Sequence, residues 1–498
     1  MKIDVVAQAI ADFPGDAVVL SLYEDGRTLT APAAAIDRRT GKLISKLVKD
    51  HEITGKLGET TVLHGCNGVK ARKIIVVGTG ERKDFGYETI RKAAAAAAKK
   101  ARQINARNVG TIIPGLDQGD IDPARAVQSI VEGTCLALYR FSGYKKPEKT
   151  SEISSLSILV QGKANIGNLK RAAGLGKNLA DAQNTARDLI NEPSNRLTPE
   201  RLYRRIESVI KDWGLVKVIK CRSLNRNAIR KSGMEAISTV AQGSAHEERF
   251  IILRYRTADK PLVGLIGKTV TFDSGGISIK SASGMAAMKG DMAGGAIAFA
   301  ATLALARAGC RMNLITLIPA VENMPSGSAY RPGDIIRAMS GKTIEIITTD
   351  AEGRLTLADA ITYAEKKGAE SIIDIATLTG GCVVALGTQI AALMTNEQEL
   401  VDKLINRSHY TGEKFWQLPL PEEYQKQLKS DVADLKNAGG RNASTITAGL
   451  FLKAFVNKAK WLHIDVAGKE LTEIENNYTP VGATGFGVRS LYELLSDM

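Results

Sequence analysis

The stretch P-L-V-G-L-I-G-K-T-V-T-F-D-S-G-G, residues 261–276, is an apolar run that passes into a polar loop with two glycines. A short apolar run bounded by turn residues is typical of a buried β-strand. The same order of strand, polar loop and helix returns along the rest of the chain. We expect further strands at 312–320, 343–349, 371–378 and 461–467, and helices at 285–309, 356–368 and 443–459. This alternation predicts an α/β fold with a largely parallel sheet, whose ligand crevice lies at the carboxyl ends of the strands.

The first third of the chain repeats the alternation on a smaller scale. Apolar strands are expected at 17–23, 73–80 and 156–162, and an alanine-rich helix at 91–103. Residues 144–155 are polar, and the loop N-E-P-S-N-R-L-T-P-E at 191–200 ends in a helix start with Thr198 as the cap. We therefore expect a small mixed α/β N-terminal domain at 1–160, a linking helical region at 161–190 and a larger α/β/α domain at 191–498.

The composition is that of an ordinary globular protein. The 498 residues are 44% hydrophobic, 24% charged and 5% aromatic, which argues against a disordered, collagen-like or disulfide-stapled chain. No stretch approaches the ~18 consecutive apolar residues that a membrane span needs. The first residues are interrupted by Asp4, Asp12 and Asp16 before a signal-peptide core can form. We expect a cytoplasmic protein without a membrane contact.

The five cysteines are scattered, without a C-x-x-C pair, and there is no H-E-x-x-H motif. Such cysteines are typical of reduced, mostly buried thiols. A metal site in this chain would therefore depend mainly on carboxylates.

The net charge of +14 is unevenly distributed. Residues 1–170 contain 26 Lys and Arg against 18 Asp and Glu, a local excess of +8. A basic excess of this kind is compatible with a DNA contact through the N-terminal region. The alternative is a basic surface without a partner, and the composition leaves both readings open.

Four carboxylates stand in predicted loops at strand ends, namely Asp273, Asp291, Asp350 and Glu352. Clustered carboxylates repel one another in a cleft unless cations are present, and their oxygens suit Mg²⁺, Mn²⁺ or Zn²⁺. The alternative is a set of solvated acids paired with Lys268, Lys280 and Arg354. Gly267-Lys268-Thr269 is not a phosphate-binding loop, because that motif needs glycine where Leu262 stands.

The segments that carry these residues resemble the leucyl (cytosol) aminopeptidase family. The similar motifs, in the family's order over 170–495, are N-E-P-S-N-R-L-T-P-E (191–200), G-K-T-V-T-F-D-S-G-G-I-S-I-K (267–280), E-N-M-P-S-G-S-A-Y-R-P-G-D (322–334), T-D-A-E-G-R-L (349–355), D-I-A-T-L-T-G-G (374–381) and H-I-D-V-A-G (463–468). Thr348 stands where the family's signature has asparagine. The resemblance implies a catalytic metallopeptidase domain at 191–498.

The resemblance also implies a site for two divalent metal ions per subunit, Mn²⁺ or Zn²⁺ and alternatively Mg²⁺. One ion would be bound by Lys268, Asp273, Asp291 and Glu352. The other would be bound by Asp273, Asp350 and Glu352, with the backbone carbonyl of Asp350. A lysine ligand must be neutral, so metal binding there would release a proton.

The implied reaction is the release of amino-terminal residues, preferably Leu or another apolar residue, from peptides. The two ions would activate a bridging hydroxide, Lys280 would stabilise the oxyanion, and Arg354 would hold a bicarbonate ion that shuttles a proton. The expected substrate-binding residues are Met288, Thr377, Leu378 and Gly380, although Met288 could instead be a residue of a helix core. The resemblance further implies a homohexamer.

Overall fold

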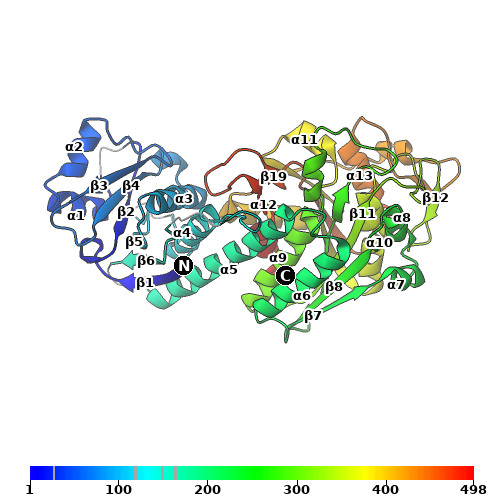
Figure 1. Ribbon diagram of the computed structural model, residues 1–498, viewed down its shortest axis with the longest axis horizontal. Helices are drawn as coiled ribbons and strands as arrows, with labels where there is room; N and C mark the ends of the chain where they lie inside the picture. The colour runs from blue at the N-terminus through cyan, green and yellow to red at the C-terminus, as the bar shows by residue number, and fades with distance from the viewer. Residues whose placement is uncertain (26–28, 117–119, 147–150, 162–164) are drawn as a thin grey trace. The chain divides into compact units, whose positions relative to one another are not determined.

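The computed structural model describes residues 1–25, 29–116, 120–146, 151–161 and 165–498 (Figure 1). These residues form two compact units. The N-terminal unit comprises Met1–Asp181, Tyr410–Gly412 and Ile474–Val481, and the C-terminal unit comprises Ala182–His409, Glu413–Glu473 and Gly482–Met498. The domain boundaries expected at 160 and 190 stay predictions.

The N-terminal unit is built around a six-stranded sheet with the order β1-β6-β5-β2-β4-β3. All neighbours are parallel except β3 and β4. The strands are β1 (Lys2–Ala7), β2 (Ala17–Leu22), β3 (Thr60–His64), β4 (Lys73–Gly78), β5 (Asn108–Thr111) and β6 (Ser155–Val160).

Helices cover both faces of this sheet, as the alternation of apolar side chains on β2 requires. Val19 belongs to the apolar cluster that contains α3 (Tyr87–Gln103) and α4 (Pro123–Ala137). Leu20, one residue on, belongs to the cluster that contains residues of α1 (Ala31–Arg39) and α2 (Leu43–Lys49).

The C-terminal unit contains a nine-stranded sheet with the order β16-β15-β18-β14-β9-β11-β8-β7, and β10 pairs with β11. Its central neighbours β18, β14, β9 and β11 are parallel, which confirms the predicted largely parallel sheet. The strands are β7 (Ile219–Leu224), β8 (Arg249–Arg256), β9 (Leu262–Gly267), β10 (Thr269–Asp273), β11 (Asn313–Asn323), β14 (Ala369–Ala376), β15 (Ile390–Thr395), β16 (Lys414–Gln417) and β18 (Lys460–Asp465).

Helices also pack on both faces of the second sheet (Figure 1). The apolar helix α9 (Ala293–Arg307) contacts β9, β11 and β14. A large apolar cluster contains side chains of α8 (Glu235–Ala241), α10 (Gly353–Lys366) and α13 (Ser444–Lys453) together with side chains of the same strands. The remaining longer helices are α5 (Ile166–Asn191), α6 (Pro199–Asp212), α12 (Gln398–Thr411) and α14 (Val488–Leu495).

Several elements differ from the sequence-based expectation: the helix expected at 443–459, for example, is α13 and ends at Lys453. Two further differences have a cause in the structure. The helix expected at 285–309 is interrupted between the 3₁₀ turn η3 (Met285–Gly290) and α9, because the carbonyl of Asp291 accepts a hydrogen bond from Val270 of β10. The strand expected at 343–349 ends early, as β13 (Thr343–Glu345), because the side chain of Asn437 accepts the next free backbone N–H, that of Ile347.

Thr198 does precede α6 as expected, but its hydroxyl makes no capping hydrogen bond. Among the described residues, none of the helices has both the length and the apolar character that crossing a membrane requires.

Candidate active site

The parallel strands of the C-terminal unit bring the loops after β9, β10 and β14 to one edge of the sheet, and the turn that follows β13 of a separate three-stranded sheet meets them there. Lys268 follows β9 directly and Asp273 is the last residue of β10. Asp350 and Glu352 lie in the turn that leads into α10, and Thr377 follows β14. The polar residues that the sequence separates by as many as 109 positions therefore meet here, as the 2.8 Å hydrogen bond from Lys268 to the carbonyl of Thr377 shows.

Three of the predicted carboxylates form a tight cluster. Asp273, Asp350 and Glu352 each present an oxygen, and these atoms all lie within 4.8 Å of one another. Asp273 and Glu352 are buried, whereas Asp350 is exposed. The ammonium group of Lys280 lies 2.8 Å from Oδ2 of Asp273 and also contacts Oδ1 of Asp350.

Lys268 joins the fourth carboxylate to this cluster. Its Nζ atom lies 2.8 Å from Oδ1 of Asp291 and 3.0 Å from Oε1 of Glu352. Burial lowers the pKa of Lys268, but the charges of Asp291, Glu352 and Asp273 outweigh it and hold the pKa above its usual value. Thr377 donates a further hydrogen bond of 2.8 Å to the same oxygen of Asp291.

Burial and mutual repulsion perturb the carboxylates themselves. Burial, together with the charge of Glu352, raises the pKa of Asp273 to about 6. Burial also raises the pKa of Asp291 well above its usual value. Burial acts in the same direction on Glu352, but the charges of Lys268 and Lys280 outweigh it, so that its pKa is lowered.

Two buried oxygens of the cluster, Oδ2 of Asp291 and Oε2 of Glu352, have no hydrogen-bond partner in the described part of the chain. Buried carboxylate oxygens ordinarily accept hydrogen bonds. Two such oxygens without a donor, one in the three-carboxylate cluster and one next to it, fit divalent cations. The four carboxylates suit Mg²⁺, Mn²⁺ or Zn²⁺, and Lys268 would join them as an amine ligand only once a bound cation has displaced its proton.

Arg354 lies in the first turn of α10 and is only 7% exposed. Its Nη1 atom donates to the carbonyl of Asn437 over 2.8 Å, while its buried Nε has no partner among the residues described. Burial lowers the pKa of Arg354 to about 10, against the opposing effect of Glu352 and Asp465. A buried guanidinium with an unused donor fits a small oxyanion.

Asp465, the last residue of β18, anchors the loop that contains Thr377, Leu378 and Gly380 through hydrogen bonds. Oδ1 of Asp465 accepts from the backbone N–H of Leu378 over 3.0 Å, and Oδ2 accepts from the hydroxyl of Thr379 over 2.7 Å. The same hydroxyl caps α11 (Gly380–Leu386) by accepting from the N–H of Cys382.

Met288 lies in η3, three residues before Asp291, and is half-buried. It is therefore not part of the core helix α9, which was the alternative that the sequence left open.

Asn323 is fully buried at the end of β11, and no sequence pattern predicts a role for it. Its Nδ2 atom donates to Oδ1 of Asp273 over 2.8 Å and to the carbonyl of Thr349 over 3.1 Å. Gly276, at φ +68°, packs so closely that a Cβ atom would lie 2.7 Å from the Asn323 amide oxygen. In the sequence Asn323 stands out only as part of the motif at 322–334. Its contact with Asp273, 50 residues away, produces no local pattern from which its role could be predicted.

Thr348, the departure from the family signature, has a local role in the loop. Its hydroxyl accepts a hydrogen bond from the backbone N–H of Asp350 over 3.2 Å. Asn437 bonds to both backbone groups of Thr348, donating to the carbonyl over 2.7 Å.

Comparison with known proteins gives consistent matches. The family model described as "Cytosol aminopeptidase family, catalytic domain" matches residues 184–492, and the N-terminal domain model of the same family matches residues 18–148. The chain is 40% identical over 502 residues to a probable cytosol aminopeptidase of Alkaliphilus oremlandii, covering 100% of both chains. It is 41% identical over 498 residues to one of Geobacter sulfurreducens, covering 99% of each.

Two solved structures are similar over nearly the whole chain. A mutant of tomato leucine aminopeptidase superposes with a TM-score of 0.89 at 31% identity, covering 100% of this chain and 97% of that one. The bottromycin maturation enzyme BotP in complex with Mn superposes with a TM-score of 0.85 at 32% identity, covering 97% of this chain and 99% of that one.

Proposed function

Because the chain belongs to the cytosol aminopeptidase family, it is a metal-dependent aminopeptidase, and we propose that it acts on peptides whose first residue is leucine or another apolar residue. The observation that carries the proposal is the buried cluster of Asp273, Asp350 and Glu352 with Asp291 and Lys268 beside it.

In this proposal one divalent ion is bound by Lys268, Asp273, Asp291 and Glu352, and the other by Asp273, Asp350 and Glu352 with the Asp350 carbonyl. The unfilled oxygens of Asp291 and Glu352 support this assignment. When bound, the ions supply an acidified water near neutral pH and a polarised scissile carbonyl. Mn²⁺ is the first candidate, since the similar BotP was solved in complex with Mn, and Zn²⁺ and Mg²⁺ are alternatives.

Lys280 is the proposed donor to the oxyanion that develops on the scissile carbonyl. Burial lowers the pKa of Lys280, but Asp273 and Glu352 outweigh this effect and raise it, so the side chain stays a charged donor. It is only about one-quarter exposed, and a donor held in a partly dry site stabilises developing charge more strongly than one in water.

Arg354 is proposed to hold bicarbonate through its unused donor. If bound there, bicarbonate would supply proton transfer between the attacking water and the leaving amine. The planar fork of the guanidinium matches a small oxyanion, and the unpartnered Nε supports the assignment.

Thr377, Leu378 and Gly380 are proposed to contact the substrate backbone, and Met288 its first side chain. A pocket that contains methionine favours leucine over charged residues, but it discriminates by only ~1–3 kcal/mol per methylene. We therefore expect a broad preference for apolar first residues.

The test is hydrolysis of leucine p-nitroanilide by protein that has been stripped with a chelator and reloaded with Mn²⁺, Zn²⁺ or Mg²⁺. Activity should return in the wild type and stay absent in the double variant Asp350→Asn, Glu352→Gln. A matched control, Glu370→Gln with Asp431→Asn, removes two exposed carboxylates and should keep full activity. A folded, metal-loaded wild type that is silent on this substrate and on a dipeptide panel would contradict the proposal.

Two further measurements test the preference for apolar first residues and the role of bicarbonate. Lysine and glutamate p-nitroanilides should be cleaved more slowly than the leucine substrate at equal enzyme concentration. Removal of bicarbonate from the buffer should lower the rate of the wild type but leave Arg354→Met unchanged, whereas Arg337→Met should respond like the wild type.

We also propose a cytoplasmic homohexamer, as the family resemblance implies. Sedimentation velocity of the purified protein tests the oligomer, and a molecular mass far below six chains would contradict it.

A DNA contact through the N-terminal region is a second candidate, and a basic groove in the N-terminal unit favours it. The groove has a volume of about 750 Å³ and is lined by five cationic side chains, Lys92, Lys99, Lys100, Arg102 and Arg140. Glu475 and Glu88 pair with Lys99 and Lys92 and so reduce this positive charge only in part.

Retention on duplex DNA at increasing salt tests this candidate. The variant Lys99→Ala, Lys100→Ala should make the slope of log K, the DNA-binding constant, against log salt concentration less negative by about 2. The control Lys46→Ala, Lys49→Ala removes two exposed lysines from α2 of the same unit and should leave the slope unchanged. Absence of retention at low salt would contradict the contact.

A further inference from the structure

Lys280 lies at the end of a segment, residues 274–280, that forms neither helix nor strand. Two large apolar side chains of this segment, Ile277 and Ile279, are 43% and 63% exposed, so packing does not fix its position. The ammonium group of Lys280 nevertheless lies 2.8 Å from Oδ2 of Asp273. Polar contacts of the segment must therefore supply the order that packing does not.

One fully buried residue, Thr349, makes several of these contacts. Its Oγ1 atom donates to the carbonyl of Gly275 over 2.6 Å and accepts from the backbone N–H of Ser278 over 2.8 Å. In return, the backbone N–H of Thr349 donates to Oγ of Ser278 over 3.1 Å. Hydrogen bonds from a single threonine therefore hold both ends of the turn at 275–278, which leads directly to Lys280.

Two glycines allow the turn to approach Thr349 this closely. Gly275 and Gly276 have φ values of +85° and +68°, a region that favours glycine. A Cβ atom at position 276 would lie 2.9 Å from Oγ1 of Thr349, and one at position 275 would lie 3.0 Å from Oδ1 of Asp350. The sequence of the turn is thus adapted to close contact with the loop that carries Asp350.

Thr349 is itself fixed from the protein interior. Its carbonyl accepts from the hydroxyl of Tyr330 over 2.7 Å and from Nδ2 of Asn323 over 3.1 Å. Tyr330 is only 1% exposed and Asn323 is fully buried. Thr349 therefore connects buried groups of the interior to the turn before Lys280, and it continues directly into Asp350, a proposed metal ligand.

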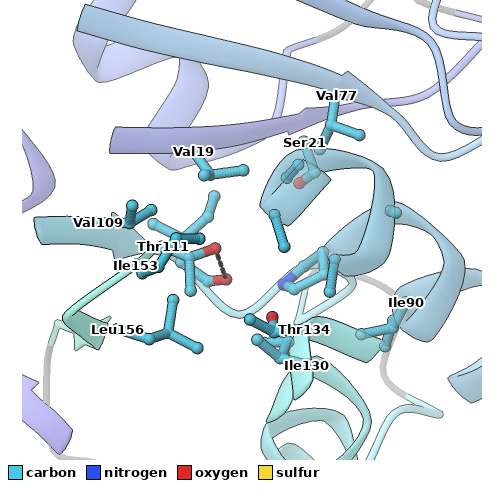
Figure 2. A pocket seen from close by; sticks show the side chains of 16 residues that line it. Val19, Ser21, Val77, Ile90, Val109, Thr111, Ile130, Thr134, Ile153 and Leu156 are labelled. Carbon is cyan, nitrogen blue, oxygen red and sulfur yellow. Dashed lines mark hydrogen bonds between the residues drawn. The ribbon is translucent and has the colours of Figure 1, made fainter. Parts of the chain in front are cut away.

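Two other buried threonines provide a contrast. Thr111 lines a cavity of about 30 Å³ in the N-terminal unit, and its hydroxyl donates to the carbonyl of the next residue, Ile112, over 3.2 Å (Figure 2). The hydroxyl of Thr302, in α9, shares a hydrogen bond of 2.6 Å with that of Thr316 in β11. Neither bond ends on the backbone of a loop with a proposed site residue, whereas both bonds of the Thr349 hydroxyl do.

We propose that Thr349 is a positioning residue, whose hydroxyl holds the turn at 275–278 and thereby places the ammonium group of Lys280 for the reaction. The inference rests on the proposed role of Lys280 as the oxyanion donor. Loss of the hydroxyl keeps Lys280 in the chain but releases the turn before it, and a misplacement of about 1 Å can cost ~10²-fold in rate. The effect of Thr349 on the reaction should therefore pass through Lys280.

A double-mutant cycle on leucine p-nitroanilide at saturating Mn²⁺ tests this coupling. Thr349→Val keeps the side-chain shape, removes the hydroxyl and should lower kcat by ~10–100-fold while KM changes little. In a Lys280→Ala background the same substitution should lower kcat by less than about threefold, because the group through which it acts is gone. Thr349→Ser keeps the hydroxyl and should retain kcat within about threefold of the wild type.

Hydrogen exchange of the metal-free protein gives a readout that is independent of catalysis. Because Oγ1 of Thr349 accepts the N–H of Ser278, peptides that span 274–284 should exchange about tenfold faster in Thr349→Val. Thr302→Val and Thr111→Val each remove a buried hydroxyl elsewhere. Both control variants should exchange like the wild type in this segment and keep its kcat.

Additive losses of kcat in Thr349→Val and Lys280→Ala, or unchanged exchange of the segment, would overturn the proposal. A Lys280→Ala variant with the kcat of the wild type would instead overturn the proposed role of Lys280, and this inference with it. If circular dichroism shows that Thr349→Val does not fold, Ser278→Ala decides, since it removes the acceptor of the Thr349 N–H. Its kcat should fall about three- to tenfold, and an unchanged kcat would overturn the proposal.

Discussion

Asn323 donates a hydrogen bond of 2.8 Å from its amide nitrogen to Oδ1 of Asp273. The same nitrogen donates to the carbonyl of Thr349, one residue before Asp350. One buried amide therefore links the loop after β10 to the loop before α10, and these two loops carry three of the proposed metal ligands. Partners that orient metal ligands in this way commonly change metal affinity or activity 10–100-fold when they are replaced.

We expect Asn323→Ala to raise the Mn²⁺ concentration needed for half-maximal activity by ~10–100-fold. Titration of chelator-stripped enzyme with Mn²⁺ measures this shift. The control is Asn313→Ala at the opposite end of the same strand, where the side chain donates to the carbonyl of Lys260. That variant should be less stable but should need the same Mn²⁺ concentration. Equal metal titrations for wild type and Asn323→Ala would show that the amide does not position Asp273.

Lys280 lies between two acids of the cluster, and its proposed role is confined to the transition state. Lys280→Ala should therefore lower kcat by ~10²–10³ while KM changes little. Steady-state kinetics on leucine p-nitroanilide at saturating Mn²⁺ make the measurement. Lys289→Ala removes a nearby lysine that donates to the backbone carbonyl of Asn191, and it should leave kcat within a few-fold of wild type. A variant at position 280 with normal kcat and raised KM would indicate a role in ground-state binding instead.

Much of the fold could be predicted from the sequence, because its strands are buried and their sequences are therefore continuous apolar runs. The approach of Lys268, Asp273 and Thr377 follows from the same fact, since the parallel strands of one sheet end at one edge. Asp350 and Glu352 instead follow β13, which belongs to a separate three-stranded sheet, so this rule does not predict their place beside Asp273. The role of Asn323 could not be predicted, because it depends on a contact between distant loops.

The interruption of the helix at Asp291 was missed for a similar reason. Its cause is a backbone hydrogen bond to Val270 of a neighbouring strand, which no local propensity reports. The short end of β13 likewise reflects Asn437, a side chain about 90 residues away.

Asp465 should control substrate binding through the loop above it. Asp465→Ala removes the acceptor of the Leu378 N–H and of the Thr379 hydroxyl, so this loop loses its fixed position. We expect KM to rise about tenfold with a smaller change in kcat, because a displaced loop weakens uniform binding first. Asp465→Asn should be milder, since it keeps one acceptor oxygen.

The matched control for this loop is Asp434→Ala, which removes an exposed aspartate that accepts from the N–H and the hydroxyl of Thr343. Its KM should equal that of the wild type. A kcat loss in Asp465→Ala at unchanged KM would mean that Asp465 acts on the chemical step.

Glu365 contributes stability that depends on pH. Its carboxylate accepts backbone hydrogen bonds of 2.9, 2.9 and 3.0 Å from Asn457, Lys458 and Ala459, and one of 2.7 Å from the Asn457 side chain. Burial raises the pKa of Glu365, but these hydrogen bonds outweigh it and hold the pKa below its usual value. Because the folded state favours the ionised form, the contribution is present above the unfolded pKa of ~4.3 and is lost as the pH falls through the folded pKa.

Glu365→Gln should therefore lower the free energy of unfolding by about 1–2 kcal/mol at pH 7, a modest value because the side chain is only half-buried. The difference from the wild type should shrink as the pH is lowered from 5 toward 3, which urea unfolding at several pH values measures. Glu370→Gln, an exposed acid at the start of β14, should have little effect at any of these pH values. A deficit for Glu365→Gln that is independent of pH would mean that the loss comes from packing and not from the ionised carboxylate.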